Sequence, residues 1–442
     1  MIKKTFKYII TFLLIFSTLS CVQVSAFQFN EFELNAKAAL LLSLDTDDVI
    51  YSQNADQKMY PASLTKMLVT AVVLDSTNDL NQKITVTKSA LNEISGTGAS
   101  VIGLKEGEEL TVEQSLYCLL IASGGDVAYI LAEHFGGDTE GFMDMMNDKA
   151  QQIGMTSSHF GNPVGLHDDQ TYCTPNDIAK LFKYVLNYPI FKEIISKSRY
   201  TLEATNKSKS RILSTTNFLI DGSTNYYYKY CNGGKTGFTD EAGRCVATTA
   251  SSGGYTYMCI IMNCNSKGGV RNEFRDSINL YKWAFNNFEY KSVLDITKPV
   301  TEIPLELSMD TDYLQLYPEQ NLKKILPKTA DESTISVKPK LNSASVKAPI
   351  TPDTVYGTAD IIYGNEVIGT VNLVSRDTIK ANVILQIGEI FKNVVGSTIF
   401  KVILIIVIGV ILVYVAIIIK LNTDSKKRHR KVRYIPYDKD KK

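Results

Sequence analysis

The sequence predicts a mixed α/β (α+β) fold: an antiparallel sheet with a helical cluster, then a small all-β domain and a C-terminal transmembrane helix. Three observations lead to this prediction. Apolar residues recur with a helical period over 111–195, while aromatic and β-branched runs alternate with glycine turns over 226–263. An unbroken apolar run fills 402–419. With 442 residues, 45% of them hydrophobic, the chain is long enough for two or more packed domains.

The N-terminus has the layout of a secretory signal peptide. Lys3, Lys4 and Lys7 precede an apolar stretch, and Val24-Ser25-Ala26 has the small-x-small shape of a cleavage site. We therefore predict a signal peptide over 1–26, so that the first folded domain begins at residue 27.

The first elements of that domain bring a serine and a lysine together. Strand-like runs at 38–45 and 49–53 predict a hairpin, and Ser63 and Lys66 follow at the start of an apolar helix. Positions i and i+3 share one helix face, so the amine of Lys66 can lie against the hydroxyl of Ser63. If burial lowers the pKa of the lysine, it can take the hydroxyl proton. Ser63 is thus a candidate nucleophile and Lys66 its candidate base.

A second candidate lies between two predicted helices. Thr111 and Gln114 form a capping-box pattern before an apolar helix that stops at Ser123, and the two glycines after Ser123 leave the space around it open. Asp126 is the predicted N-cap of the next helix. Further helices are predicted at 142–153, 176–186 and 191–195.

A third candidate lies within a predicted antiparallel meander. Its strands are predicted at 226–231, 244–250 and 255–263, and a closing helix at 277–288. Between the first two runs lies Lys235-Thr236-Gly237. On an edge strand, the lysine and the hydroxyl would together bind a carboxylate, and Gly237 would let a substrate backbone approach closely. A hairpin with an exposed lysine is the alternative interpretation.

The C-terminal third changes in character. Seven of the twelve prolines fall among short strand-like fragments, which predicts a small β domain. Basic residues after the apolar run are expected to stay cytoplasmic, which places the body of the chain outside the cell membrane. The predicted segments are the β domain 298–380, a linker or amphipathic segment 381–400, a transmembrane helix 401–420 and a basic cytoplasmic tail 421–442.

Charge and cysteine usage exclude other classes. Residues 420–442 carry ten Lys and Arg against three Asp, and 1–26 carries three Lys, so the overall +1 leaves 27–419 at about −9. An acidic exported body is not expected to bind nucleic acid. The six cysteines beyond the signal peptide and the histidines show no metal-ligand spacing, so we expect buried free thiols and no cofactor.

Taken in chain order, the three sites form a motif set. Ser63 to Lys66, Ser123 to Gly125 and Lys235 to Gly237 resemble the Ser-x-x-Lys, Ser-x-Asn and Lys-Thr-Gly motifs of the serine D-alanyl-D-alanine carboxypeptidases, the low-molecular-mass penicillin-binding proteins. The resemblance covers roughly 35–290. It implies a penicillin-binding/β-lactamase-like catalytic domain over 27–297, acting on peptidoglycan pentapeptide stems and inhibited covalently by β-lactams.

The resemblance also implies residue roles. Ser63 would attack the carbonyl of the penultimate D-Ala with Lys66 as base, and Ser123 would relay the proton to the leaving amine. Lys235 and Thr236 would hold the terminal carboxylate, with Lys235 also keeping Lys66 neutral by charge repulsion. The backbone N–H groups of Ser63 and Phe238 would form the oxyanion hole.

One position departs from the pattern. Gly125 replaces the family's asparagine, so the amide that would bond Lys66 and the substrate is missing. Leaving a partner unpaired costs about 1–3 kcal/mol, unless water or Asp126 takes the place of the amide. Two other functions remain open. One is a serine β-lactamase, although no Glu-x-x-Leu-Asn segment follows the second motif; the other is a non-catalytic wall-binding scaffold, which Gly125 would favour.

Overall fold

The computed structural model describes residues 33–265 and 267–431. The predicted signal peptide, 1–26, lies outside the described residues, as do residues 432–442 of the predicted tail. The chain divides into two compact units. The first comprises Met1–Lys291 and Lys323–Asp331, and the second Ser292–Leu322 and Glu332–Lys442. The sequence did not indicate that Lys323–Asp331 would return to the first unit.

A five-stranded antiparallel sheet forms the centre of the first unit. Its strand order is β2-β1-β9-β8-β7, which puts β7 at one edge. The strands are β1 Ala36–Ser43, β2 Val49–Gln53, β7 Cys231–Thr239, β8 Gly243–Ser252 and β9 Tyr255–Cys264. Because side chains alternate between the faces of a strand, Leu40 packs into a core on one side of the sheet and Leu41 into a core on the other.

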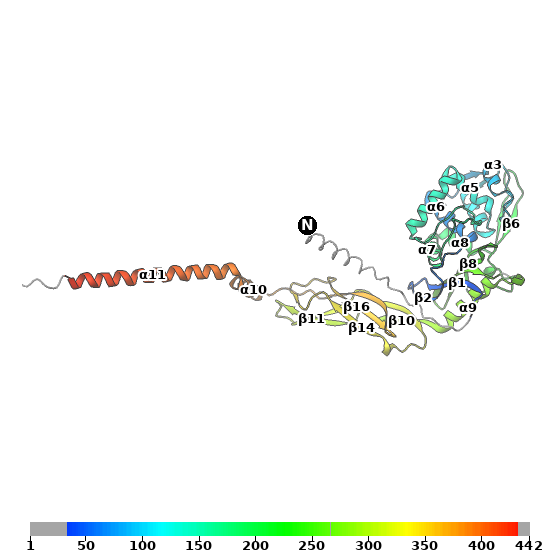
Figure 1. Cartoon of the computed structure of the whole chain (residues 1–442). Coiled ribbons are helices and arrows are strands. Elements are labelled where there is room, and N and C mark those ends of the chain that lie inside the picture. Colours follow the sequence, from blue (N-terminus) through cyan, green and yellow to red (C-terminus); the bar gives the residue numbers. More distant parts are fainter. Residues whose placement is uncertain (1–32, 266, 432–442) are drawn as a thin grey trace, which may run out of the picture. The chain divides into compact units, whose positions relative to one another are not determined.

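Helices cover both faces of this sheet. Figure 1 shows α5 to α8 gathered on one side and α9 on the other. The helices are η1 Ala62–Thr65, α2 Lys66–Ser76, α3 Lys88–Ile94, α4 Val112–Ile121, α5 Gly125–Gly136, α6 Thr139–Ile153, α7 Pro175–Val185, α8 Pro189–Ile195, η2 Phe218–Ile220, η3 Lys267–Gly269 and α9 Asn272–Asn287. Two small hairpins complete the unit, formed by β3 Lys83–Thr85 with β4 Glu109–Thr111 and by β5 Arg199–Leu202 with β6 Arg211–Ser214.

Helix α2 is the central helix of the cluster. Every residue from Lys66 to Leu74 is buried, so the helix has no solvent-facing side over that stretch. A helix that is apolar all round is stable only inside a core. Lys66 is the first residue of this helix, and its chain position alone therefore puts an amine into a low-dielectric environment.

Several local predictions can be compared with the structure. The capping box of Thr111 and Gln114 is confirmed, and all three further helices are present. The N-cap prediction for Asp126 is wrong, because Gly124 is the N-cap and Asp126 lies in the first turn of α5. Helix α3 was missed, although Thr87 caps it by accepting the N–H of Ala90.

The strand predicted at 226–231 is also wrong. This tyrosine-rich segment is irregular, and the edge strand begins only at Cys231. The ring of Tyr228 is buried and stacks on Tyr281 of α9, with 5.9 Å between ring centroids. Tertiary packing of the aromatic rings, rather than strand pairing, thus accounts for the composition of this segment.

The second unit confirms the predicted small all-β domain. Its six-stranded sheet has the order β14-β16-β17-β12-β11-β15. The strands are β11 Thr301–Glu306, β12 Tyr313–Pro318, β14 Ser336–Leu341, β15 Val346–Lys347, β16 Val355–Tyr363 and β17 Glu366–Val374. A separate ribbon pairs β10 Phe288–Leu294 with β13 Leu322–Pro327, and most of its residues belong to the first unit. In the second unit, η4 spans Glu332–Thr334. Ile303 and Leu305 of β11 alternate with more exposed neighbours and enter a core with Leu314 and Leu316.

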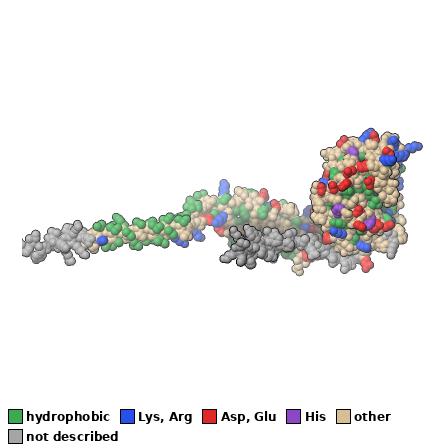
Figure 2. Space-filling view, turned by 45° about the horizontal axis from the view of Figure 1, so that its top comes forward, with side chains coloured by type: hydrophobic (Ala, Val, Ile, Leu, Met, Phe, Trp, Pro, Cys, Tyr) green, Lys and Arg blue, Asp and Glu red, His purple; other side chains and the backbone are tan. Residues whose placement is uncertain are grey.

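Two helices follow this sheet. They are α10 Val383–Gly396 and α11 Thr398–Lys431. Within α11, Thr398–Thr423 is long and apolar enough to cross a membrane. Figure 2 shows hydrophobic side chains along the visible face of this helix. This confirms the predicted C-terminal apolar helix as a candidate anchor.

Candidate active site

Ser63 and Lys66 meet where η1 passes into α2. The Nζ atom of Lys66 lies 2.9 Å from the Oγ of Ser63 and donates a hydrogen bond of 2.9 Å to the carbonyl oxygen of Val164. Ala62 has a φ of +47°, a left-handed conformation immediately before the serine. The predicted pair is therefore within hydrogen-bonding distance, although Ser63 lies on a 3₁₀ turn rather than on the α-helix itself.

Burial makes Lys66 a possible base. Its side chain is 1% exposed, and desolvation lowers the pKa of Lys66 to about 7, although the negative charge of Asp126 acts in the opposite direction. At neutral pH a large fraction of the amine is therefore unprotonated. An unprotonated amine 2.9 Å from a hydroxyl can accept its proton.

Ser123 and Lys235 form a second pair beside the first. The Nζ of Lys235 donates to the Oγ of Ser123 at 2.9 Å and to the carbonyl oxygen of Thr236 at 2.8 Å. Ser123 has a φ of +59° in the tight turn between α4 and α5. Lys235 is fully buried, and its amine lies behind the hydroxyl of Ser123.

Burial disfavours the charge of Lys235 as it does that of Lys66. Burial holds the pKa of Lys235 well below its usual range, and the charge of Lys66 lowers it further. A positive charge on Lys66 therefore disfavours one on Lys235, and both amines lie in a low-dielectric site.

A cleft of about 830 Å³ opens along the edge of β7. Ser63, Lys66 and Ser123 line it together with Thr236, Gly237 and Phe238. The hydroxyl of Thr236 is 2.5 Å from that of Thr216, which also lines the cleft. The cleft therefore brings together residues from all three sequence motifs.

Gly237 is required by a close approach of two backbones. A Cβ atom at this position would lie 2.9 Å from the backbone nitrogen of Ser63 and 3.0 Å from the carbonyl oxygen of Pro61. No side chain fits there without moving η1 away from β7. The glycine thus sets the distance between the candidate nucleophile and the edge strand. Phe238, the next residue, is 46% exposed.

The structure shows why a glycine, and not the asparagine of the Ser-x-Asn motif, fits at position 125. This glycine is buried, its N–H donates to the carbonyl oxygen of Ser100 at 2.7 Å, and a Cβ would lie 3.0 Å from that oxygen and from Ile94. Asp126 does not replace the missing amide, because its carboxylate accepts backbone N–H groups of residues 102–104. The carbonyl of Val164 is instead the second partner of Lys66.

Two arginines in the cleft were not predicted. The guanidinium of Arg244 lies 4.7 Å from the ring centroid of Phe238, and that of Arg271 lies 4.5 Å from the ring of Phe218. Both arginines approach the buried carboxylate of Glu273, at 3.9 Å and 2.6 Å. Arg244 of β8 lies opposite Phe238 of β7 in the sheet register. A sequence prediction with the correct bounds for these two strands would therefore have placed Arg244 beside the cleft. Nothing in the sequence pointed to Arg271.

Comparison with known proteins assigns the chain to a family. A family model described as D-alanyl-D-alanine carboxypeptidase matches residues 24–266, which is more than half of the chain. The chain belongs to this family. A model of the C-terminal domain of penicillin-binding protein 5 matches 288–381 of the carboxypeptidase. The predicted family, fold class and enzyme class, a serine-type carboxypeptidase, are thereby confirmed.

Relatives of this carboxypeptidase match most of its length. The D-alanyl-D-alanine carboxypeptidase DacF of Bacillus subtilis is 26% identical over 354 residues, covering 79% of this chain and 87% of the relative. DacA of Escherichia coli is 26% identical over 337 residues, covering 74% and 79%. Among solved structures, penicillin-binding protein 5 of Haemophilus influenzae has a TM-score of 0.66 at 23% identity and covers 80% of this chain and 100% of that one. That structural likeness supports the fold.

Proposed function

We propose that this carboxypeptidase removes the terminal D-Ala from D-Ala-D-Ala ends of peptidoglycan stem peptides through an acyl-enzyme on Ser63, and that β-lactams acylate the same oxygen. The observation that carries the proposal is the 2.9 Å contact between a buried amine of lowered pKa and the Ser63 hydroxyl, in a cleft beside the edge strand. The family match gives the alternatives of a β-lactamase and a scaffold no support.

The proposed reaction has two halves. Lys66 accepts the proton of Ser63 while Oγ attacks the peptide carbonyl, and backbone N–H groups of Ser63 and Phe238 stabilise the oxyanion. The C–N bond then breaks, and the proton passes from Lys66 through Ser123 to the departing D-Ala amine. In the second half, water attacks the ester carbonyl with Lys66 again as base. The stem peptide leaves with a new carboxylate, and the Ser63 hydroxyl is restored.

The terminal carboxylate of the substrate is proposed to bind at the edge-strand end of the cleft. The hydroxyls of Thr236 and Thr216 face each other there, and Arg244 and Arg271 add positive charge. Lys235 acts from behind Ser123. A bound carboxylate would favour the protonated form of Lys235, because an opposite charge raises the pKa of an amine.

The proposed function is tested by incubating the purified protein with a peptide that ends in D-Ala-D-Ala. One equivalent of D-Ala released per peptide is the expected product. A peptide that ends in L-Ala-L-Ala is the control and should stay intact. Following a chromogenic β-lactam in parallel separates a carboxypeptidase, which holds a long-lived adduct, from a β-lactamase, which turns it over rapidly.

The pH dependence of the reaction tests the role of Lys66. The pKa of Lys66 is lowered to about 7, and only the unprotonated amine is a base. Below that pH the protonated form of Lys66 predominates, so kcat/KM is expected to fall by about tenfold for each pH unit below the pKa. Above the pKa, kcat/KM is expected to level off. A profile of kcat/KM measured with the D-Ala-D-Ala peptide checks this. A flat profile through pH 7 would exclude Lys66 as the titrating base.

The C-terminal helices are proposed to hold the enzyme at the cell membrane, with the catalytic unit outside and the basic tail inside. Thr398–Thr423 is the proposed single span. The proposed catalytic domain spans 27–297, and the proposed β domain spans 298–380. Orientation follows from the basic residues after the span and the signal-like N-terminus.

Helix α10 is proposed to lie in the membrane interface. One face carries exposed apolar side chains, including Ile387, Ile390 and Phe391, whereas Lys392 lies on the other face. An Ile390→Trp variant in vesicles containing brominated lipid is expected to show strong quenching of its added tryptophan fluorescence. The matched Lys392→Trp variant should show little. Equal quenching at both positions would contradict an interfacial α10; the native Trp283 provides the common background.

A further inference from the structure

The wall of the cleft beside Ser123 is a loop without regular secondary structure. Residues 97–100 of this loop line the cleft, and residues 95–108 connect α3 to β4. Gly96, Gly98 and Gly103 have φ values of +76°, +74° and +77°, which any other residue adopts only with strain. Glycines leave a chain with more conformational freedom to lose on folding. A loop of this composition needs external anchors to hold one shape.

Asp126 is the first anchor. Its carboxylate accepts the backbone N–H groups of Ile102 and Gly103 at 3.0 Å and that of Leu104 at 3.3 Å. The side chain is 1% exposed, so these bonds are shielded from water. Asp126 lies three residues after Ser123 in the chain. The turn that presents the candidate relay serine therefore also holds the cleft loop.

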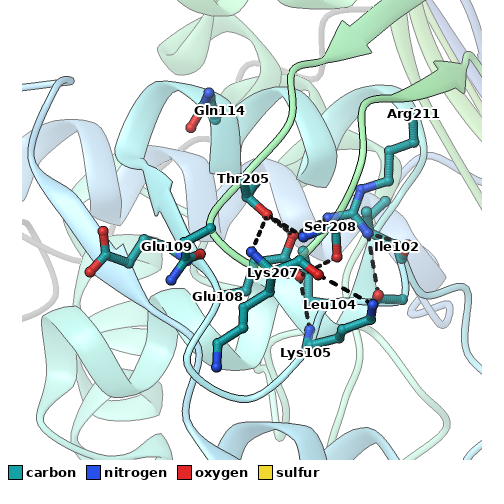
Figure 3. A network of polar contacts seen from close by, with 12 residues as sticks. Ile102, Leu104, Lys105, Glu108, Glu109, Gln114, Thr205, Lys207, Ser208 and Arg211 are labelled. Atoms are coloured by element: carbon teal, nitrogen blue, oxygen red, sulfur yellow. Dashed lines mark hydrogen bonds and ion pairs between the residues drawn. The ribbon is translucent and has the colours of Figure 1, made fainter.

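Arg211 and Glu108 form the second anchor (Figure 3). The guanidinium of Arg211 donates to the carbonyl oxygen of Gly103 at 3.2 Å and pairs with the fully buried carboxylate of Glu108. Thr205 and Ser208 donate their hydroxyls to the same carboxylate at 2.8 Å and 3.3 Å. Asp126 thus holds the N–H groups of the loop while Arg211 holds a carbonyl.

The second anchor is also connected to another part of the cleft lining. Arg211 is the first residue of β6, and the chain continues directly into Thr215 and Thr216, which line the cleft. Thr216 contacts the hydroxyl of Thr236 at 2.5 Å. Arg211 therefore connects the loop to β6, the strand that leads to the proposed binding position of the substrate carboxylate.

The loop occupies the space that a side chain at position 125 would need. The carbonyl oxygen of Ser100 accepts the Gly125 N–H at 2.7 Å and would lie 3.0 Å from a Cβ there. We propose that Asp126, Glu108 and Arg211 are positioning residues that hold loop 97–104 as a substrate-contacting wall, in place of the side-chain amide that Gly125 lacks. This inference rests on the proposed function, since it concerns how the same cleft binds its peptide.

The test compares Arg211→Lys and Arg211→Ala with a matched control. Lysine keeps a cation for Glu108 but has no planar fork to reach the carboxylate and the loop carbonyls together. Glu109→Gln removes the neighbouring exposed pair of Glu109 with Lys83, whose atoms are 3.0 Å apart, and should leave the reaction unchanged. Amide hydrogen exchange and peptide kinetics are measured on each full-length variant in detergent.

Both arginine variants are expected to raise KM for the D-Ala-D-Ala peptide by about tenfold and to leave kcat within about twofold, because a displaced wall weakens binding rather than the chemical step. Exchange should accelerate at the amides of residues 102–104 and stay unchanged in β8 and β9. An unchanged KM in Arg211→Lys despite faster loop exchange would overturn the inference, as would faster exchange across the whole unit.

Gly125→Asn provides an independent test that leaves the buried ion pair intact. Its Cβ would meet Ile94 and Ser100, so the asparagine is expected to displace the loop and raise KM, not to restore a missing contact. A lower KM than that of the wild type would contradict the inference. If the wild-type protein released no D-Ala, the proposed function would fail, while the exchange rates would still show whether the loop is anchored.

Discussion

Ser63→Ala is expected to abolish release of D-Ala, with a loss of about a million-fold in kcat, because no other hydroxyl among the described residues is hydrogen-bonded to the Lys66 amine. Apart from Ser63, the hydrogen-bond partner of the Lys66 amine among the described residues is the carbonyl oxygen of Val164, which cannot attack a peptide. The measurement is D-Ala release from a D-Ala-D-Ala peptide over many hours.

Ser76→Ala is the matched control for this variant. Ser76 ends the same helix α2 and donates its hydroxyl to the carbonyl oxygen of Val72 at 2.7 Å, away from the cleft lining. Its replacement should leave kcat close to that of the wild type. Retained turnover in Ser63→Ala would show that another residue is the nucleophile.

Lys66→Met is expected to slow acylation by about a thousand-fold, the size of a general-base contribution. Methionine has a similar volume and no charge, so it fits the buried start of α2. Because burying an amine costs free energy of solvation, this variant should be as stable to heat as the wild type or more so. The measurement is the second-order rate constant for labelling by a fluorescent penicillin, together with the melting temperature.

Lys58→Met controls for the loss of a nearby lysine. Lys58 is exposed, and its amine lies 3.7 Å from the ring centroid of Tyr172. We expect its labelling rate to match that of the wild type. A Lys66→Met protein that acylates at the wild-type rate would show that another group serves as base, with Lys66 kept only for packing.

The sequence was sufficient for the parts of the site that depend on short-range spacing. Ser63 and Lys66 are three residues apart, so the start of one helix brings them together whatever the rest of the fold does. The capping box at Thr111 likewise depends only on local geometry. Motif order then linked these elements to Lys235, although nothing local showed that the lysine would be buried behind Ser123.

The parts that depend on tertiary packing were not predictable from the sequence. Tyr226, Tyr228 and Tyr230 have strand propensity but pack into the core that includes α9, and the edge strand is instead Cys231–Thr239. Asp126 has the sequence pattern of an N-cap, yet its carboxylate binds a loop more than twenty residues earlier in the chain. Arg211 and Glu108 are more than one hundred residues apart, so only the fold reveals their pairing.

Acylation of Ser63 is the step on which the proposed reaction depends. Its most direct test is mass spectrometry of the full-length protein after treatment with a penicillin, followed by peptide mapping of the adduct. One penicillin per chain is expected, attached to the peptide that contains Ser63, with no adduct in Ser63→Ala. An adduct mapped to Ser123 or to any other residue, or a wild-type protein that remains unmodified, would contradict it.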